Sequence, residues 1–140
     1  MTTIELVFSV WAALHPAAPR QAHAAEIANA ISYAVEHDAS HVWGHDEDAA
    51  VLAAYALAES WLNPGAVGDG GRSWGVWQQR RAVGGADVQT QAVGALRHMH
   101  EGQAVCPESP AAPFSGGCVE ARTVADRRVR RALGILSRLH

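Results

Sequence analysis

Glu59 is the residue whose type and position are best suited to acid catalysis in this chain. It is the only ionisable carboxylate between Asp48 and Asp69, and it lies in a nearly uninterrupted apolar run from Ala49 to Leu62. Burial penalises the charged form of a carboxyl, and a carboxyl that keeps its proton at neutral pH can donate it to a leaving group. The alternative is a structural glutamate that turns to solvent or caps a neighbouring loop.

A helix over residues 46–62 is expected to position Glu59. Its first turn is acidic, with Asp46, Glu47 and Asp48, and acidic residues stabilise the N-terminus of a helix. Alanine and leucine favour helix, and the apolar positions lie on every side of it. The pattern therefore predicts a buried helix, which the Asn-Pro-Gly sequence at 63–65 should end.

Three short motifs follow one another around this carboxylate. They are Glu59-Ser60, the NPGAV sequence at 63–67, and the GVWQ sequence at 75–78 after a glycine-rich link. Their order and spacing resemble the soluble lytic transglycosylase and goose-type lysozyme superfamily, over about residues 46–80. In that superfamily a Glu-Ser pair ends a central helix, and a Gly-Leu-Met-Gln-like motif closes the sugar-binding cleft.

The resemblance implies a role for each matching residue. Glu59 would be the catalytic acid, Ser60 a cleft hydroxyl near the substrate, and Gln78 a contact to the sugar. Val76 and Trp77 stand where the family has Leu and Met. This substitution keeps the apolar character of the motif but changes its shape.

Asp69 is a candidate second carboxylate. The segment GDGGRSWG at 68–75 resembles the goose-type form, in which an Asp precedes the closing motif. Such a residue could activate water in an inverting hydrolase, whose carboxyl groups are about 6.5–9.5 Å apart. Without it, Glu59 would serve as acid and then base, and the substrate's own hydroxyl would give an anhydro product. An Asp before Gly is also common turn chemistry.

The family often places a tyrosine hydroxyl beside the catalytic glutamate. Here the segment 114–117 occupies that place, and Phe114 has no hydroxyl. Tyr55, one helical turn before Glu59, is the candidate to replace it as a substrate-site residue.

A small hairpin beside the cleft is expected from Ala66-Val67 and the segment 73–78. Three tryptophans near it, Trp61, Trp74 and Trp77, suit stacking on a sugar ring. Trp74 is the first candidate for such substrate binding, and core packing is the alternative for each.

His37, His41 and His45 recur at intervals of four, which on a continuous helix would align three imidazoles for a metal. Gly44 and the polar run at 38–40 argue against a continuous helix, and no His-Glu-x-x-His motif is present. We therefore expect a solvated loop, with no metal and no organic cofactor.

The 140 residues suit a single domain with its own core. The formal net charge of −3 gives no reason to expect a nucleic-acid partner. An all-α, lysozyme-like domain over residues 1–140 is expected, with several helices around the buried central one. The flanking helices are predicted at 4–14, 21–37, 88–102 with Asp87 as N-cap, and 119–139.

The apolar run from Ile4 to Leu14 has no basic start and is interrupted by Glu5, so it does not fit a signal peptide. It is also too short to span a bilayer, so stable membrane insertion is not expected. A wall-directed enzyme would then need phage-encoded lysis, a place in a virion, or a specialised export apparatus.

Cys106 and Cys118 close a loop rich in Pro, Gly and Ser. A disulfide there would stabilise the fold by about 3 kcal/mol in the chain-entropy account, and would indicate an oxidising destination such as the periplasm or the extracellular space. Two free thiols are the alternative.

Arginines concentrate in the last helix, from Arg122 to Arg138. They could attract acidic wall polymers or anionic membranes. A solvated face with intrahelical ion pairs is the alternative, and the same choice applies to Arg80 and Arg81.

Taken together, these features predict a lysozyme or lytic transglycosylase. It would act on the glycan strands of peptidoglycan at the bacterial cell wall, and would cleave the β-1,4 bond between N-acetylmuramic acid and N-acetylglucosamine. The alternative is a catalytically inactive wall-binding or virion-associated structural protein of the same fold. A weaker third possibility is a metal-dependent activity through His37, His41 and His45.

Overall fold

The computed structural model describes residues 1–38, 40–114 and 116–140. Among these described residues 64% are helical and the sheet has two short strands, so the expected all-α fold with a small hairpin is confirmed. The helices are α1 (Thr3–Leu14), α2 (Ala24–His37), α3 (His45–Ser60), α4 (Arg81–Gly84), α5 (Val88–Val105) and α6 (Arg122–Leu139), with short 3-10 turns at Ala18–Arg20 and Ala112–Phe114.

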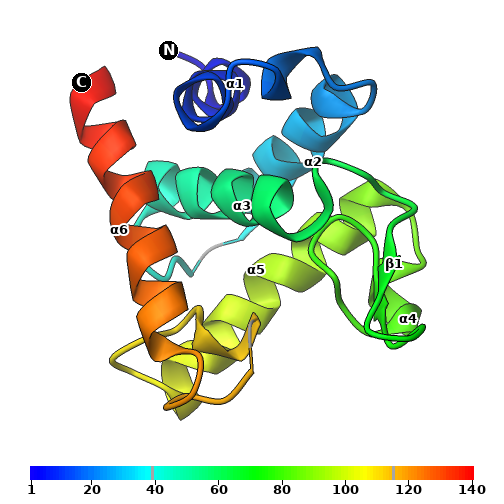
Figure 1. The fold of residues 1–140 in the computed structure, drawn as a ribbon. Helices are drawn as coiled ribbons and strands as arrows, with labels where there is room; N and C mark the ends of the chain where they lie inside the picture. Colours follow the sequence, from blue (N-terminus) through cyan, green and yellow to red (C-terminus); the bar gives the residue numbers. More distant parts are fainter. Residues whose placement is uncertain (39, 115) are drawn as a thin grey trace.

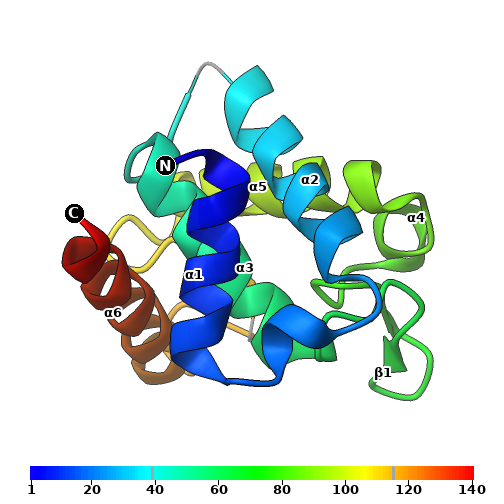
Figure 2. The same cartoon turned by 90° about the horizontal axis from the view of Figure 1, so that it is seen from above.

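Helix α3 lies at the centre of the molecule. Helices α1, α2, α5 and α6 all contact it, and the two views show them arranged around it (Figures 1 and 2). In the part of the chain that the structure describes, no helix combines the length and apolarity needed to cross a membrane.

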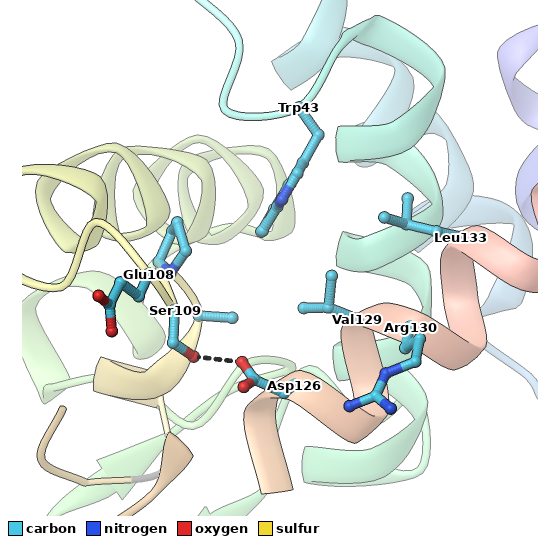
Figure 3. A pocket seen from close by; sticks show the side chains of 9 residues that line it. Trp43, Glu108, Ser109, Asp126, Val129, Arg130 and Leu133 are labelled. Carbon is cyan, nitrogen blue, oxygen red and sulfur yellow. Dashed lines mark hydrogen bonds between the residues drawn. The ribbon is translucent and has the colours of Figure 1, made fainter. Parts of the chain in front are cut away.

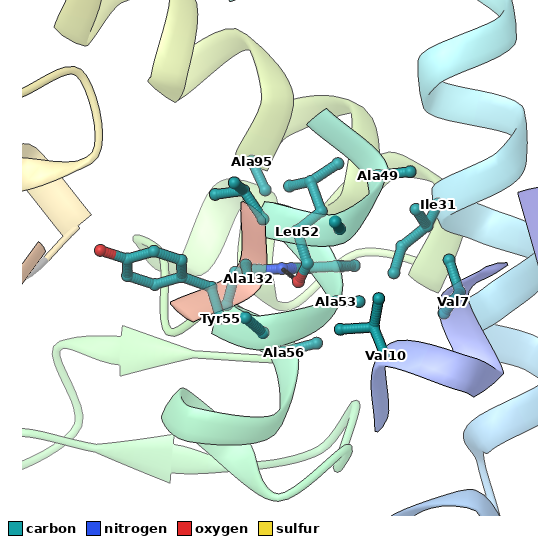
Figure 4. Packing of buried hydrophobic residues seen from close by; sticks show 14 of the residues in the cluster. Val7, Val10, Ile31, Ala49, Leu52, Ala53, Tyr55, Ala56, Ala95 and Ala132 are labelled. Atoms are coloured by element: carbon teal, nitrogen blue, oxygen red, sulfur yellow. Dashed lines mark hydrogen bonds between the residues drawn. The ribbon is translucent and has the colours of Figure 1, made fainter. Parts of the chain in front are cut away.

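The small side chains of α3 allow these neighbours to approach. Ala49, Ala53 and Ala56 are completely buried on one side of the helix (Figure 4). Burial continues around the helix, because Ala50, Val51, Leu52 and Tyr55 are also completely buried. Two buried indoles also bind its backbone: the indole N–H of Trp11 donates to the Ala53 carbonyl and that of Trp77 to the Leu52 carbonyl, each at 2.9 Å. The prediction of a central buried helix is thus confirmed.

The buried carboxylate of Asp48 holds the loop before α3. It accepts hydrogen bonds from the backbone N–H groups of Val42 at 3.1 Å and Trp43 at 3.0 Å. The Nδ1 atom of His41 lies 3.2 Å from the same carboxylate. Asp48 therefore orders this loop from within the first turn of the helix, in addition to any effect on the helix dipole.

The end of α3 differs from the prediction. The helix stops at Ser60, before the Asn-Pro-Gly sequence, because Trp61 adopts a left-handed conformation with φ of 56°. The backbone N–H of Trp61 donates to the Leu57 carbonyl at 3.0 Å, and that of Leu62 donates to the Ala56 carbonyl at 3.3 Å. These bonds satisfy carbonyls that the helix end would otherwise leave unpaired.

The hairpin is present but shorter than predicted. Strands β1 (Val67–Gly68) and β2 (Ser73–Trp74) are antiparallel, with Val67 opposite Trp74. Gln91 of α5 fixes the segment after the hairpin: its side-chain oxygen accepts from the Val76 N–H and its amide donates to the Ala86 carbonyl, both at 2.8 Å. The hairpin is therefore anchored to α5 by a buried amide.

Other helix predictions need smaller corrections. An additional short helix, α4, lies between the hairpin segment and α5, and its first residue is Arg81. Helix α2 begins at Ala24, because a turn occupies residues 21–23. The last helix begins at Arg122 instead of residue 119, and Val124 in its first turn is 43% exposed while Ala125 is completely buried.

Cys106 and Cys118 are joined by a disulfide. The loop that they close is also attached to α6, because the Ser109 hydroxyl donates to the Asp126 carboxylate at 2.8 Å (Figure 3). A hollow of about 310 Å³ lies between this loop, Trp43 and α6. The loop is thereby tied both to itself and to the last helix.

We predict that Gln91→Leu lowers the free energy of unfolding by about 2–4 kcal/mol, because it leaves the buried Val76 N–H and the half-buried Ala86 carbonyl without their hydrogen bonds. Denaturant unfolding of the variant measures this loss. Gln89→Leu is the matched control, since Gln89 is exposed on the same helix. Equal stability of the two variants would contradict the anchoring role of Gln91.

Candidate active site

Glu59 lies in the last turn of α3 and is held by an ion pair. Its Oε1 atom accepts a hydrogen bond at 2.8 Å from Nη1 of Arg128, which belongs to α6. The side chain of Glu59 is 19% exposed and that of Arg128 is 31% exposed. The carboxylate therefore lies at the edge of the core, where a ligand from solvent can reach it.

Tyr55 packs beneath this pair. Its ring is completely buried, the Arg128 guanidinium lies 5.3 Å from the ring centroid, and the Phe114 ring lies 4.9 Å away. Its hydroxyl points away from the aliphatic cluster around Leu52 (Figure 4).

The proposed hydrogen bond from Tyr55 to Glu59 is not formed. The Tyr55 hydroxyl has no hydrogen-bond partner among the described residues, and Arg128 is the side chain that donates to Glu59. In the segment 114–117, Ser115 lies outside the described residues. Arg128 therefore takes the place that the resemblance assigns to a tyrosine hydroxyl.

Burial raises the pKa of Tyr55 to about 12. The negative charge of Glu59 acts in the same direction, and the positive charge of Arg128 partly offsets both effects. Tyr55 is consequently a neutral member of the cluster at any physiological pH.

The Ser60 hydroxyl forms hydrogen bonds with backbone groups at the end of α3. Its hydroxyl donates to the Ala56 carbonyl and accepts from the Asn63 N–H, both at 3.1 Å. The Asn63 side chain in turn accepts from the Gly65 N–H at 2.9 Å. These residues therefore shape the turn that follows Glu59, and a contact of Ser60 to substrate would be additional to this role.

Gln78 closes the hairpin segment and also lines a groove. Its backbone is left-handed, with φ of 49°. Its amide nitrogen donates to the carbonyls of Gly75 at 2.9 Å and Ala66 at 3.2 Å. Because one side of Gln78 remains at the groove wall, it can meet a ligand there.

This groove has a volume of about 650 Å³ and lies between the Gln78 segment, α4, α5 and the Ala112–Phe114 turn. Polar and charged side chains line much of it, including Arg80, Arg97 and His98. The imidazole of His98 stacks on Phe114 with centroids 4.9 Å apart. Phe114 also contacts Tyr55, on whose ring Arg128 packs. Glu59 and Arg128 themselves are not among the residues that line the groove.

Asp69 lies in the turn of the hairpin. It is exposed, has a left-handed backbone with φ of 51°, and accepts a hydrogen bond from the Ser73 hydroxyl. Its carbonyl accepts from the Arg72 side chain at 3.2 Å. These contacts fit the turn alternative for Asp69, and they involve residues of the hairpin alone.

The three tryptophans occupy different surroundings. Trp77 is completely buried, which leaves it no part in sugar stacking. Trp74 is half-buried; its indole N–H donates to the Gly71 carbonyl at 2.9 Å, and the Arg81 guanidinium covers its ring at 4.9 Å. Trp61 is the exposed one, at 42%.

The rings of His41 and His45 are neighbours, with centroids 5.8 Å apart, but each of the three histidines has a different partner. His37 contacts the Tyr33 carbonyl through Nδ1, His41 contacts Asp48, and His45 contacts Asp46. Among the described residues no three side chains of His, Cys, Asp or Glu are placed to hold a metal ion.

Arg128 is the site residue that the sequence analysis missed. It was grouped with the surface arginines of the last helix, but it is spaced three and four residues from the buried Ala125 and Ala132. This spacing places it on the inner face of the helix. Its position relative to buried alanines is the signal that distinguishes it from its neighbours.

We predict that Tyr55 ionises near pH 12 in the folded protein. Because this pKa is raised above the unfolded value of about 10, the associated stability is complete below pH ~10 and is lost as the pH rises to ~12. Ultraviolet titration of a Tyr33→Phe variant, which retains Tyr55 alone, measures the pKa. Ionisation near the unfolded value in the folded state would contradict the prediction.

No family model matches the chain, and neither a curated protein nor a solved structure shows significant similarity to it.

Proposed function

We propose that this protein cleaves peptidoglycan, at the β-1,4 bond between N-acetylmuramic acid and N-acetylglucosamine, with Glu59 as general acid. The observation that carries the proposal is the placement of Glu59: a partly exposed carboxylate at the exit of a buried helix, paired with one cation. The motif resemblance of residues 46–80 supplies the substrate class. The groove beside Gln78 offers room for a sugar.

In this mechanism Glu59 protonates the glycosidic oxygen as positive charge develops on the sugar. Arg128 orients the carboxyl group through the hydrogen bond to Oε1. It also stabilises the carboxylate that remains after proton transfer, because a cation at hydrogen-bond distance favours the negative charge. The second carboxyl oxygen of Glu59 is then the atom that meets the substrate.

The sugar would be held by groups at the groove wall. Gln78 is positioned there by its bonds to the hairpin, and Arg97 and His98 project from α5. Phe114, with one ring face on His98, extends this wall toward Tyr55. The enzyme needs no metal for the steps assigned to these side chains.

A second function is favoured by the same ion pair. In this ion pair the Glu59 carboxylate accepts a hydrogen bond from Arg128 at 2.8 Å. A general acid must instead carry a proton that it can donate. A protein that binds peptidoglycan and does not cleave it would keep Glu59 in this structural pair.

Glu59→Gln separates the two functions. If Glu59 is the acid, the variant should clear purified peptidoglycan at least about 100-fold more slowly, because an amide cannot donate the proton. Sedimentation with insoluble peptidoglycan should show that binding survives. Thermal unfolding checks that loss of the ion pair leaves the fold intact.

Glu36→Gln serves as the matched control, since Glu36 is exposed on α2. It should clear peptidoglycan at the wild-type rate. Absence of clearing by the wild-type protein, with binding retained, would replace the enzymatic proposal by the binding one.

The products distinguish hydrolysis from transglycosylation. If Asp69 activates water, mass spectrometry of released muropeptides should find reducing ends, and Asp69→Asn should slow their formation by about 100-fold. Anhydro ends, with an unaffected Asp69→Asn variant, would assign Asp69 to the hairpin turn and leave Glu59 as the single catalytic carboxylate.

A further inference from the structure

Arg128, the partner of Glu59, lines a further cavity that is separate from the groove beside Gln78. It has a volume of about 350 Å³ and is enclosed by the C-terminal end of α1, the last turns of α3, and α6. Its wall combines apolar, aromatic and cationic side chains. They include Leu57, Trp61 and His15, with Arg128 and Arg131 from α6.

Trp61 provides an aromatic surface at this cavity. It is 42% exposed, and the edge of the His15 ring meets it at 90° with centroids 4.8 Å apart. The indole N–H groups of Trp11, Trp74 and Trp77 each donate to a backbone carbonyl. That of Trp61 makes no such bond within the described residues, so it is available to a ligand.

The backbone at Trp61 makes this placement unusual. A left-handed residue at a helix end is most often Gly or Asn, because other side chains crowd the following carbonyl. Trp61 nevertheless occupies it, with φ of 56° and ψ of 42°. The conformation turns the indole outward against His15, where it forms one wall of the cavity.

The cationic side of the cavity comes from α6. Arg131 is exposed and forms no ion pair with a described residue, whereas Arg128 is bonded to Glu59. No carboxylate is among the residues that line the cavity. An anion would therefore find two guanidinium groups, one of them free and the other shared with Glu59.

We propose that this cavity binds a small organic anion, in which a flat apolar ring carries a carboxylate, sulfonate or phosphate group. The ring would stack on Trp61 over the apolar floor formed by Leu57. The anionic group would be bound by Arg131 and would compete with Glu59 for Arg128. The site exists whether or not Glu59 is catalytic, and its occupation would change the partner of Glu59.

The probe for this site is anilinonaphthalene sulfonate, an aromatic anion whose fluorescence rises in apolar surroundings. The folded protein should bind it at one saturable site. Uncharged phenylnaphthylamine, which has the same rings without the sulfonate, should bind at least about tenfold more weakly, because it cannot engage the arginines.

Variants assign the probe to the cavity. Arg131→Gln and Trp61→Asn should each weaken its binding by about tenfold, through loss of the cation and of the stacking surface. Asn suits a left-handed backbone, so Trp61→Asn retains the helix end. Arg127→Gln is the matched control, because Arg127 is exposed on the same helix but does not line this cavity.

Glu59→Gln tests the shared arginine. Removal of the competing carboxylate should strengthen probe binding by about threefold or more, since Arg128 is then free for the anion. Near-ultraviolet circular dichroism confirms that each variant is folded. Equal weakening in Arg127→Gln and Arg131→Gln, equal affinity for the uncharged probe, or no effect of Glu59→Gln would each overturn the proposal.

Discussion

Burial of α3 on all sides is the constraint on which the rest of this structure depends. Four other helices contact α3, and its residues 49–53, 55 and 56, four of them alanines, are all completely buried. Trp11 and Trp77 fill the remaining space and donate to its carbonyls. Because the body of the helix is so enclosed, the polar residues near its C-terminal end are the ones that can serve both the core and the surface.

The pairing of Glu59 with Arg128 follows from this arrangement. A carboxylate at the edge of an apolar core needs a partner for its charge, and α6, the last helix of the chain, supplies it. The same guanidinium covers Tyr55 and lines the cavity at Trp61. Arg128 therefore connects the candidate acid, the buried tyrosine and the proposed anion site, so a change at one of them alters the surroundings of the others.

Structural features that arise from local sequence pattern could be predicted. The apolar run with an acidic first turn predicted α3, and Asp87 predicted the start of α5, where its side chain accepts from the Thr90 N–H. Features that depend on contacts between distant segments could not be predicted from local sequence pattern. The partner of Glu59 is separated from it by 69 residues, and the end of α3 depends on a left-handed Trp61. The indole N–H of the buried Trp77 likewise finds its partner, the Leu52 carbonyl, in a distant segment.

The central claim is that Glu59 meets the glycosidic bond of a peptidoglycan strand. A crystal structure of Glu59→Gln with a bound glycan fragment of alternating N-acetylglucosamine and N-acetylmuramic acid tests it most directly. The account predicts a glycosidic oxygen within hydrogen-bond distance of the side chain at position 59, with a sugar against Gln78. A glycan bound away from position 59, with that side chain still enclosed against Arg128, would contradict it.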